Sequence, residues 1–213
     1  GVTLRGKGDG IYGFRLDPSS GALRPLGPPT GAANPSYLGF DRSRRFLYAV
    51  NELKAFHGQP TGTVSAFAVD PETGALSLLN RQPTHGTDPC HVVVGRDRRH
   101  VFVANFMSGS VCVLPVQDDG SLGPACDFVS HIGSGIDPLR QAGPHAHSVT
   151  LDAANRYAYV PDLGLDKVLI YRFDATRGML EPNAPAWLKL RPGDGPRHLA
   201  PPFENARALG VAV

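Results

Sequence analysis

The hydrophobic residues of this chain fall in short runs separated by turn-forming residues, and the runs recur in a fixed order. One phrase occurs four times: PSYLGFDRSRRFLYAVNE from Pro35, PCHVVVGRDRRHVFVANF from Pro89, PHAHSVTLDAANRYAYVPDL from Pro144 and PRHLAPPFENARALGVAV from Pro196. A second phrase alternates with it, beginning at Ile11, Val64, Val111 and Val168. A period of about 50 residues filled with strand-like runs is typical of a repeated β array and predicts a β-propeller.

Each complete repeat contains four candidate strands. In the second repeat they cover 91–94, 101–105, 110–116 and 125–130, with Gly, Asp and Ser in the breaks between them. These residues favour the short turns that join antiparallel strands. The first run is the most apolar and the fourth the least regular. We therefore expect the first strand to line a crowded centre and the fourth to form a solvated outer edge, as in a propeller blade.

The repeats divide the chain into blades. We expect an all-β, single partial β-propeller domain with complete blades over 34–87, 88–142 and 143–194 and partial blades over 1–33 and 195–213. Propellers typically have about four to eight blades, so three would make too tight a ring. The sequence thus predicts an incomplete ring, and its exposed blade edges predict self-association.

Charge and cysteine content narrow the class of partner. The formal net charge is only +2 and the basic residues are scattered, which predicts neither a nucleic-acid nor a membrane partner. No apolar run approaches the roughly 20 residues that span a bilayer. The three cysteines, Cys90, Cys112 and Cys126, lack CxxC spacing and are expected to be reduced thiols of a cytoplasmic protein. A small-molecule partner is the remaining expectation.

Polar and ionisable side chains recur where the first strand of each repeat begins and where the second ends. Because these two strands form an antiparallel hairpin, both points lie at the same end of the blade. The strand starts carry Tyr37, His91, His145, His147, Arg197 and His198. The strand ends carry Asn51, Glu52, Asn105 and Asp162. Such convergence on one mouth of the central channel predicts a ligand site on a rigid scaffold.

In this order, the phrases YAVNE, VANFMSGSV, PHAHSV, PDLGLDKV and RPGDGPRHL resemble the seven-bladed propeller lactonase family. The resemblance covers nearly all of residues 8–200 and is most specific over 143–198. This family includes propeller-type 6-phosphogluconolactonases and fungal enzymes that cyclise carboxymuconate. The resemblance implies a longer parent with seven blades. After His198 the chain departs from the family pattern, without the later acidic residue and second arginine, so it is expected to be a truncated member.

The family resemblance supports three residues as candidate catalytic groups. His147 is expected to act as a general base or acid, since an imidazole exchanges protons near neutral pH; the alternative is a hydrogen bond to loop backbone. Arg197 could bind a carboxylate or phosphate or stabilise an oxyanion, or instead form a salt bridge between blades. Glu52 could orient a water molecule or close a contact between blades.

The remaining polar positions are candidate substrate-binding residues: Asn51, His91, Asn105, His145, Asp162 and His198. Each has a structural alternative, such as bracing a turn for Asn105 and Asp162. The HxH phrase with His91 and Asp162 could in principle offer zinc ligands. These ligands would come from separate blades, so neither a metal nor another cofactor is expected.

Three functions remain open. The first is hydrolysis of a sugar-derived lactone, foremost 6-phosphoglucono-δ-lactone to 6-phosphogluconate. The second uses the same site to lactonise a carboxymuconate, which is also an anionic substrate. The third is a non-catalytic truncated propeller that serves as a scaffold.

Overall fold

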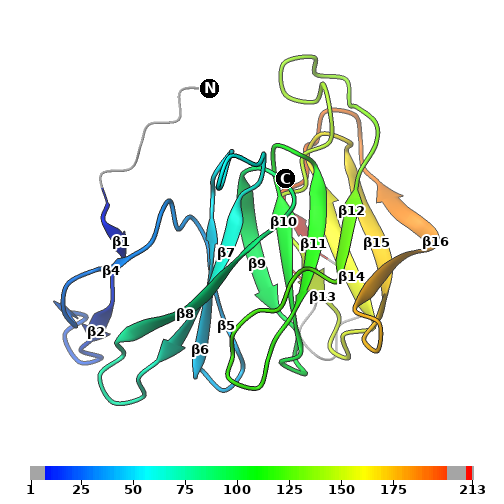
Figure 1. The fold of residues 1–213 in the computed structure, drawn as a ribbon. Coiled ribbons are helices and arrows are strands. Elements are labelled where there is room, and N and C mark those ends of the chain that lie inside the picture. The colour runs from blue at the N-terminus through cyan, green and yellow to red at the C-terminus, as the bar shows by residue number, and fades with distance from the viewer. Residues whose placement is uncertain (1–7, 201–209, 213) are drawn as a thin grey trace.

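The computed structural model describes residues 8–200 and 210–212, in which every regular element is a β-strand. Three four-stranded antiparallel sheets follow one another along the chain and stand side by side (Figure 1). The first contains β5 (Leu38–Phe40), β6 (Phe46–Asn51), β7 (Thr63–Val69) and β8 (Leu76–Pro83). The second contains β9 (Pro89–Val94), β10 (His100–Asn105), β11 (Ser110–Pro115) and β12 (Asp127–Ser130). The third contains β13 (Thr150–Leu151), β14 (Tyr157–Asp162), β15 (Lys167–Asp174) and β16 (Met179–Lys189).

In each sheet the strands pair in sequence order, as in a propeller blade. Three two-stranded pairs flank these sheets: β1 (Gly10–Ile11) with β4 (Thr30–Gly31), β2 (Phe14–Leu16) with β3 (Leu23–Pro25), and β17 (His198–Ala200) with β18 (Gly210–Ala212). Residues 8–200 and 210–212 form no closed ring. The predicted all-β, partial-propeller fold is therefore confirmed. The parts of the predicted partial blades at 1–7, 201–209 and 213 lie outside the described residues.

The sheets pack face to face through strictly alternating side chains. In β6, Leu47 and Ala49 point to one face and form a cluster with Ile11. Tyr48 and Val50 point to the other face and join a cluster shared with the second sheet. This period of two buries both faces of an inner blade, and burial of apolar area supplies the main stabilisation.

Burial differs between the first and second strands of the sheets. The second strands are the most deeply buried: every residue of β10 is buried, whereas Leu38 and Phe40 of β5 are 40% and 55% exposed. The reason is geometric. A second strand has a neighbouring strand on each edge and a packed sheet on its faces, while β5 pairs along one edge only.

A repeated turn joins the two outer strands of the first and third sheets and also connects β2 with β3. Its glycine adopts a left-handed backbone and donates its N–H to the aspartate carbonyl four positions earlier. The pairs are Asp17 and Gly21, Asp70 and Gly74, and Asp174 and Gly178, at 2.8, 2.8 and 2.7 Å. The glycine φ values of 71°, 74° and 69° are accessible at low cost only without a Cβ. The DxxxG phrase thus fixes the register of each outer hairpin.

Candidate functional site

The structure gathers aromatic and imidazole rings from four separate repeats into one chain of contacts. Successive ring centroids lie 4.3 Å apart for Tyr37 and His91, 6.0 Å for His91 and His198, 5.0 Å for His198 and His147, 5.7 Å for His147 and Phe106, and 4.7 Å for Phe106 and His145. Four of the six rings are candidates from the sequence. The strand starts of different repeats therefore do meet in space.

His147 lies on the segment that precedes β13. Its backbone N–H donates to the Pro161 carbonyl at 3.0 Å, which ties the segment to the end of β14. Burial lowers the pKa of His147 to about 4, with further contributions from the positive charge of Arg197 and from His198. Its Nδ1 is buried and has no hydrogen-bond partner among the residues that the structure describes. The ring is therefore neutral at pH 7 and is not held by a structural hydrogen bond.

His91, on β9, is differently engaged. Its ring is only 8% exposed, and its Nδ1 accepts a hydrogen bond from the Val149 N–H at 3.3 Å. Burial lowers the pKa of His91 to about 3, helped by the neighbouring His198 and His147. The neutral His91 ring, which accepts the Val149 N–H, therefore stabilises the segment that carries His147.

Arg197 and His198 follow Pro196 at the start of β17. The Ser148 hydroxyl donates to the Arg197 carbonyl at 2.8 Å, so the arginine backbone is anchored one residue from His147. Both side chains are exposed. That of Arg197 lines a cavity of about 550 Å³ together with Leu163 and the Gly193–Gly195 loop. A positive charge thus faces open space beside a neutral imidazole.

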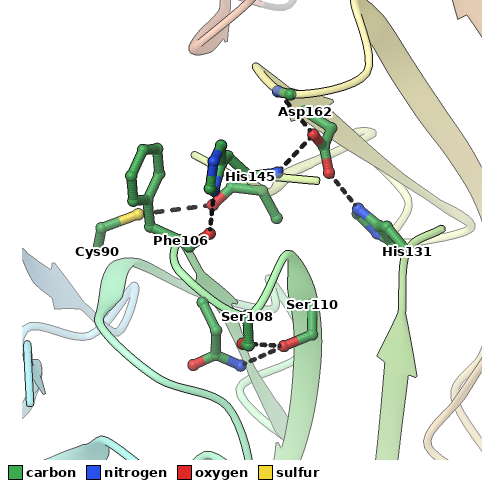
Figure 2. A network of polar contacts seen from close by, with 10 residues as sticks. Cys90, Phe106, Ser108, Ser110, His131, His145 and Asp162 are labelled. Atoms are coloured by element: carbon green, nitrogen blue, oxygen red, sulfur yellow. Dashed lines mark hydrogen bonds and ion pairs between the residues drawn. The ribbon is translucent and has the colours of Figure 1, made fainter. Parts of the chain in front are cut away.

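Asp162 lies at the end of β14, is fully buried, and makes the polar contacts drawn in Figure 2. One carboxylate oxygen accepts the backbone N–H groups of His145 and Gly164 at 2.7 and 3.0 Å, and the other lies 2.6 Å from Nδ1 of His131. His145 is further fixed by its Nδ1, 3.0 Å from the Phe106 carbonyl. All of these contacts hold the loop that presents His147.

The two candidate asparagines are also buried. Asn51 donates to the Ala33 carbonyl at 2.8 Å and accepts from the hydroxyls of Thr63 and Ser65 at 3.0 and 2.7 Å. Asn105 donates to the Thr84 carbonyl at 3.3 Å and to Ser110 Oγ at 3.2 Å. Their amides connect strands and loops within the protein, and for Asn105 this is the bracing role given above as the alternative to substrate binding.

Glu52 is half-buried and is linked through its backbone to Asn34. Its charge contributes, after burial, to raising the pKa of the Cys90 thiol to about 12. Cys90 Sγ in turn donates to the His147 carbonyl at 3.3 Å. Glu52 therefore lies in electrostatic range of the segment that carries His147.

Two further residues at this end of the blades are not predicted by the repeat pattern, His131 and Arg140. His131 follows β12 and meets Asp162 from the next blade. Arg140 lines the same cavity as Arg197. Comparing the repeats could not predict a role for either residue, because both lie on the loop between β12 and β13, which does not recur in the other repeats. In the described part of the chain, no group of three or more His, Cys, Asp or Glu side chains could hold a metal ion.

Comparison with known proteins decides the family. The model of the family described as "Lactonase, 7-bladed beta-propeller" matches residues 1–208. This chain belongs to the seven-bladed β-propeller lactonase family. The family resemblance that the sequence phrases indicated is thereby confirmed.

Relatives of this lactonase-family chain carry concordant names. It is 35% identical over 200 residues to the 6-phosphogluconolactonase of Bacillus subtilis, covering 94% of this chain and 54% of the relative. It is 31% identical over 198 residues to the 6-phosphogluconolactonase of Formosa agariphila, covering 92% and 55%. The solved periplasmic gluconolactonase of Pseudomonas aeruginosa superposes with a TM-score of 0.85 and 37% identity, covering 92% and 56%. The chain spans about half the length of these relatives.

Proposed function

We propose that this chain carries the catalytic groups for hydrolysis of a sugar-derived lactone, foremost 6-phosphoglucono-δ-lactone to 6-phosphogluconate. The observation that carries the proposal is the pairing of His147, neutral at pH 7 and free of structural hydrogen bonds in the described residues, with the exposed cation Arg197. The names of the relatives support the substrate class.

The proposed reaction follows from these two groups. His147 takes a proton from a water molecule as the water oxygen attacks the lactone carbonyl carbon. The carbonyl oxygen becomes an oxyanion, which the Arg197 guanidinium stabilises. Collapse of this intermediate breaks the ring C–O bond, and the imidazolium returns its proton to the leaving alkoxide. The product is an open-chain carboxylic acid, which ionises.

The other candidate residues take supporting roles in this proposal. Glu52 orients the attacking water, and His198 contacts the substrate beside His147, since its ring lies 5.0 Å from that of His147. Asn51, His91, Asn105, His145 and Asp162 are assigned positioning roles because each uses a polar side-chain atom in an internal hydrogen bond.

Location and partners complete the proposal. The described residues contain no helix that could cross a membrane. We assign the protein to the cytoplasm on its three free cysteines, although one relative is named as periplasmic. We also assign it self-association through exposed apolar side chains at the ends of the sheet array.

The test is to follow acid release from 6-phosphoglucono-δ-lactone with the purified chain, against the spontaneous rate. A carboxymuconate is assayed in parallel. Accelerated lactone opening without muconate turnover supports the proposal. The reverse preference would overturn it in favour of a lactonising enzyme, and no acceleration of either reaction would favour the scaffold.

A further inference from the structure

The cavity beside Arg197 contains a second arginine that the proposed reaction does not use. Arg140 lines the same space of about 550 Å³ and is exposed. Neither guanidinium has a hydrogen bond or ion pair to another residue within 8–200 or 210–212. Two unpaired cations in one cavity repel each other and favour an anionic ligand.

The two carboxylates that line this cavity, Asp137 and Asp194, already form contacts with other residues. Asp137 accepts the backbone N–H groups of Leu139 and Arg140 at 2.9 and 3.3 Å and so shapes the turn that carries the arginine. Asp194 forms an ion pair with Arg191 at 3.4 Å and accepts its backbone N–H. Asp194 is thus compensated by Arg191, while Asp137 keeps its charge but forms no ion pair with Arg140 or Arg197 within the described residues.

Two walls of the cavity, the Gly193–Gly195 loop and the turn that ends at Gln141, are both hydrogen-bonded to one carboxylate. Asp166, which is 5% exposed, accepts the N–H groups of Gly193 and Gly195 at 2.8 Å each. The same carboxylate accepts Gln141 Nε2 at 2.8 Å. Arg140 directly precedes Gln141, and Arg197 lies two residues beyond Gly195. The cavity is thus built before any ligand arrives, which reduces the ordering cost of binding.

We propose that Arg140 is a specificity residue that binds the phosphate group of the substrate in the cavity it shares with Arg197. This inference rests on the proposed function. A dianionic phosphate accepts two parallel N–H donors from one guanidinium. Arg197 is within electrostatic range of His147, whose pKa it lowers, and Arg140 supplies the second positive group of the cavity. The arrangement selects phosphorylated over unphosphorylated sugar lactones.

The test compares the binding of 6-phosphogluconate, gluconate and inorganic phosphate to the wild-type chain and to Arg140→Gln by titration calorimetry. The variant should bind 6-phosphogluconate about tenfold to a hundredfold more weakly, from the loss of a charge-assisted contact, and inorganic phosphate more weakly too. Its affinity for gluconate should be unchanged. The control is Arg156→Gln, at the opposite end of β14, which should match the wild type in all three titrations.

The outcomes separate this proposal from the proposed function. Equal affinity of the wild type and Arg140→Gln for 6-phosphogluconate would overturn the role of Arg140 while leaving the lactonase proposal intact. Loss of gluconate binding in the variant would also overturn it, as a general disturbance of the site. Phosphate binding that depends on Arg140, in a chain that binds neither sugar acid, would overturn the sugar specificity and count against the lactonase proposal.

Discussion

At the scale of single residues, the state of His147 depends on its burial and on the charge beside it. We predict that Arg197→Gln raises the pKa of His147 from about 4 toward the ordinary value of about 6.5, because one of the causes that lowers it is removed while burial remains. An NMR titration of the His147 ring protons measures this directly. An unchanged pKa would show that Arg197 does not act on His147.

The same shift couples to stability. The unfolded chain binds a proton on this histidine below about pH 6.5, whereas the folded chain does so only near pH 4. Above pH 6.5 the ionisation of His147 does not affect the free energy of unfolding. As the pH falls from 6.5 to 4, protonation of the unfolded chain lowers this free energy. The pH dependence of the unfolding free energy across this window should be shallower in Arg197→Gln than in the wild type.

Asp162 provides a second prediction at this scale. Asp162→Ala removes the acceptor for two backbone N–H groups and the partner of buried His131, and should lower the free energy of unfolding by about 3–5 kcal/mol. Urea denaturation measures the loss. The control is Glu181→Ala, which removes surface ion pairs with Arg172 and Arg177 and should cost less than about 1 kcal/mol. Similar losses in both variants would contradict the bracing role.

Residue identity predicted only part of this site. The period placed His91, His147, Arg197 and His198 at strand starts, and antiparallel pairing then required them to share one end of the blades. His131 could not be found in this way. Its contact with Asp162 joins residues 31 positions apart in different blades, through a loop that does not repeat.

At the scale of elements, the segment before β13 depends on close backbone contact with the turn after β14. A Cβ at Gly164 would lie 1.9 Å from the Gly143 carbonyl oxygen, which is too close for any side chain. Gly164→Ala should therefore displace the segment that carries His145 and His147. We expect a loss of about 1–3 kcal/mol in unfolding free energy together with weaker 6-phosphogluconate binding.

Gly143→Ala is the matched control, because a Cβ there meets no atom within 4 Å and the backbone is not left-handed. It should retain wild-type stability and binding. If both glycine variants behave alike, the close approach at Gly164 does not position the site.

Strand positions were predictable because alternation and turn residues are local signals. The runs expected at 101–105 and 110–116 correspond to β10 and β11 within one residue at each end. β13 shrinks to Thr150–Leu151, although the third repeat carries the same phrase. The HAH segment before it is held instead by Asp162 and Pro161, a tertiary influence that local propensity does not contain.

At the scale of the whole molecule, apolar side chains are exposed on the β2–β3 hairpin, at one end of the described array of sheets. Leu16 and Leu23 face each other across β2 and β3 and are 58% and 62% exposed. We predict concentration-dependent self-association, measured by sedimentation velocity and reduced by replacing both residues with lysine. Leu139→Lys, on the loop between β12 and β13 and away from this hairpin, is the control and should not reduce it. A monomer at all concentrations would contradict the prediction.

The measurement that tests the central claim most directly is the rate of 6-phosphoglucono-δ-lactone opening by the wild type, His147→Asn and His85→Asn. His85 is an exposed histidine outside the chain of ring contacts at the site. Loss of a general base predicts a rate about 10²–10⁴-fold lower for His147→Asn, with His85→Asn equal to the wild type. Equal rates for His147→Asn and the wild type would contradict the assignment of His147 as the base.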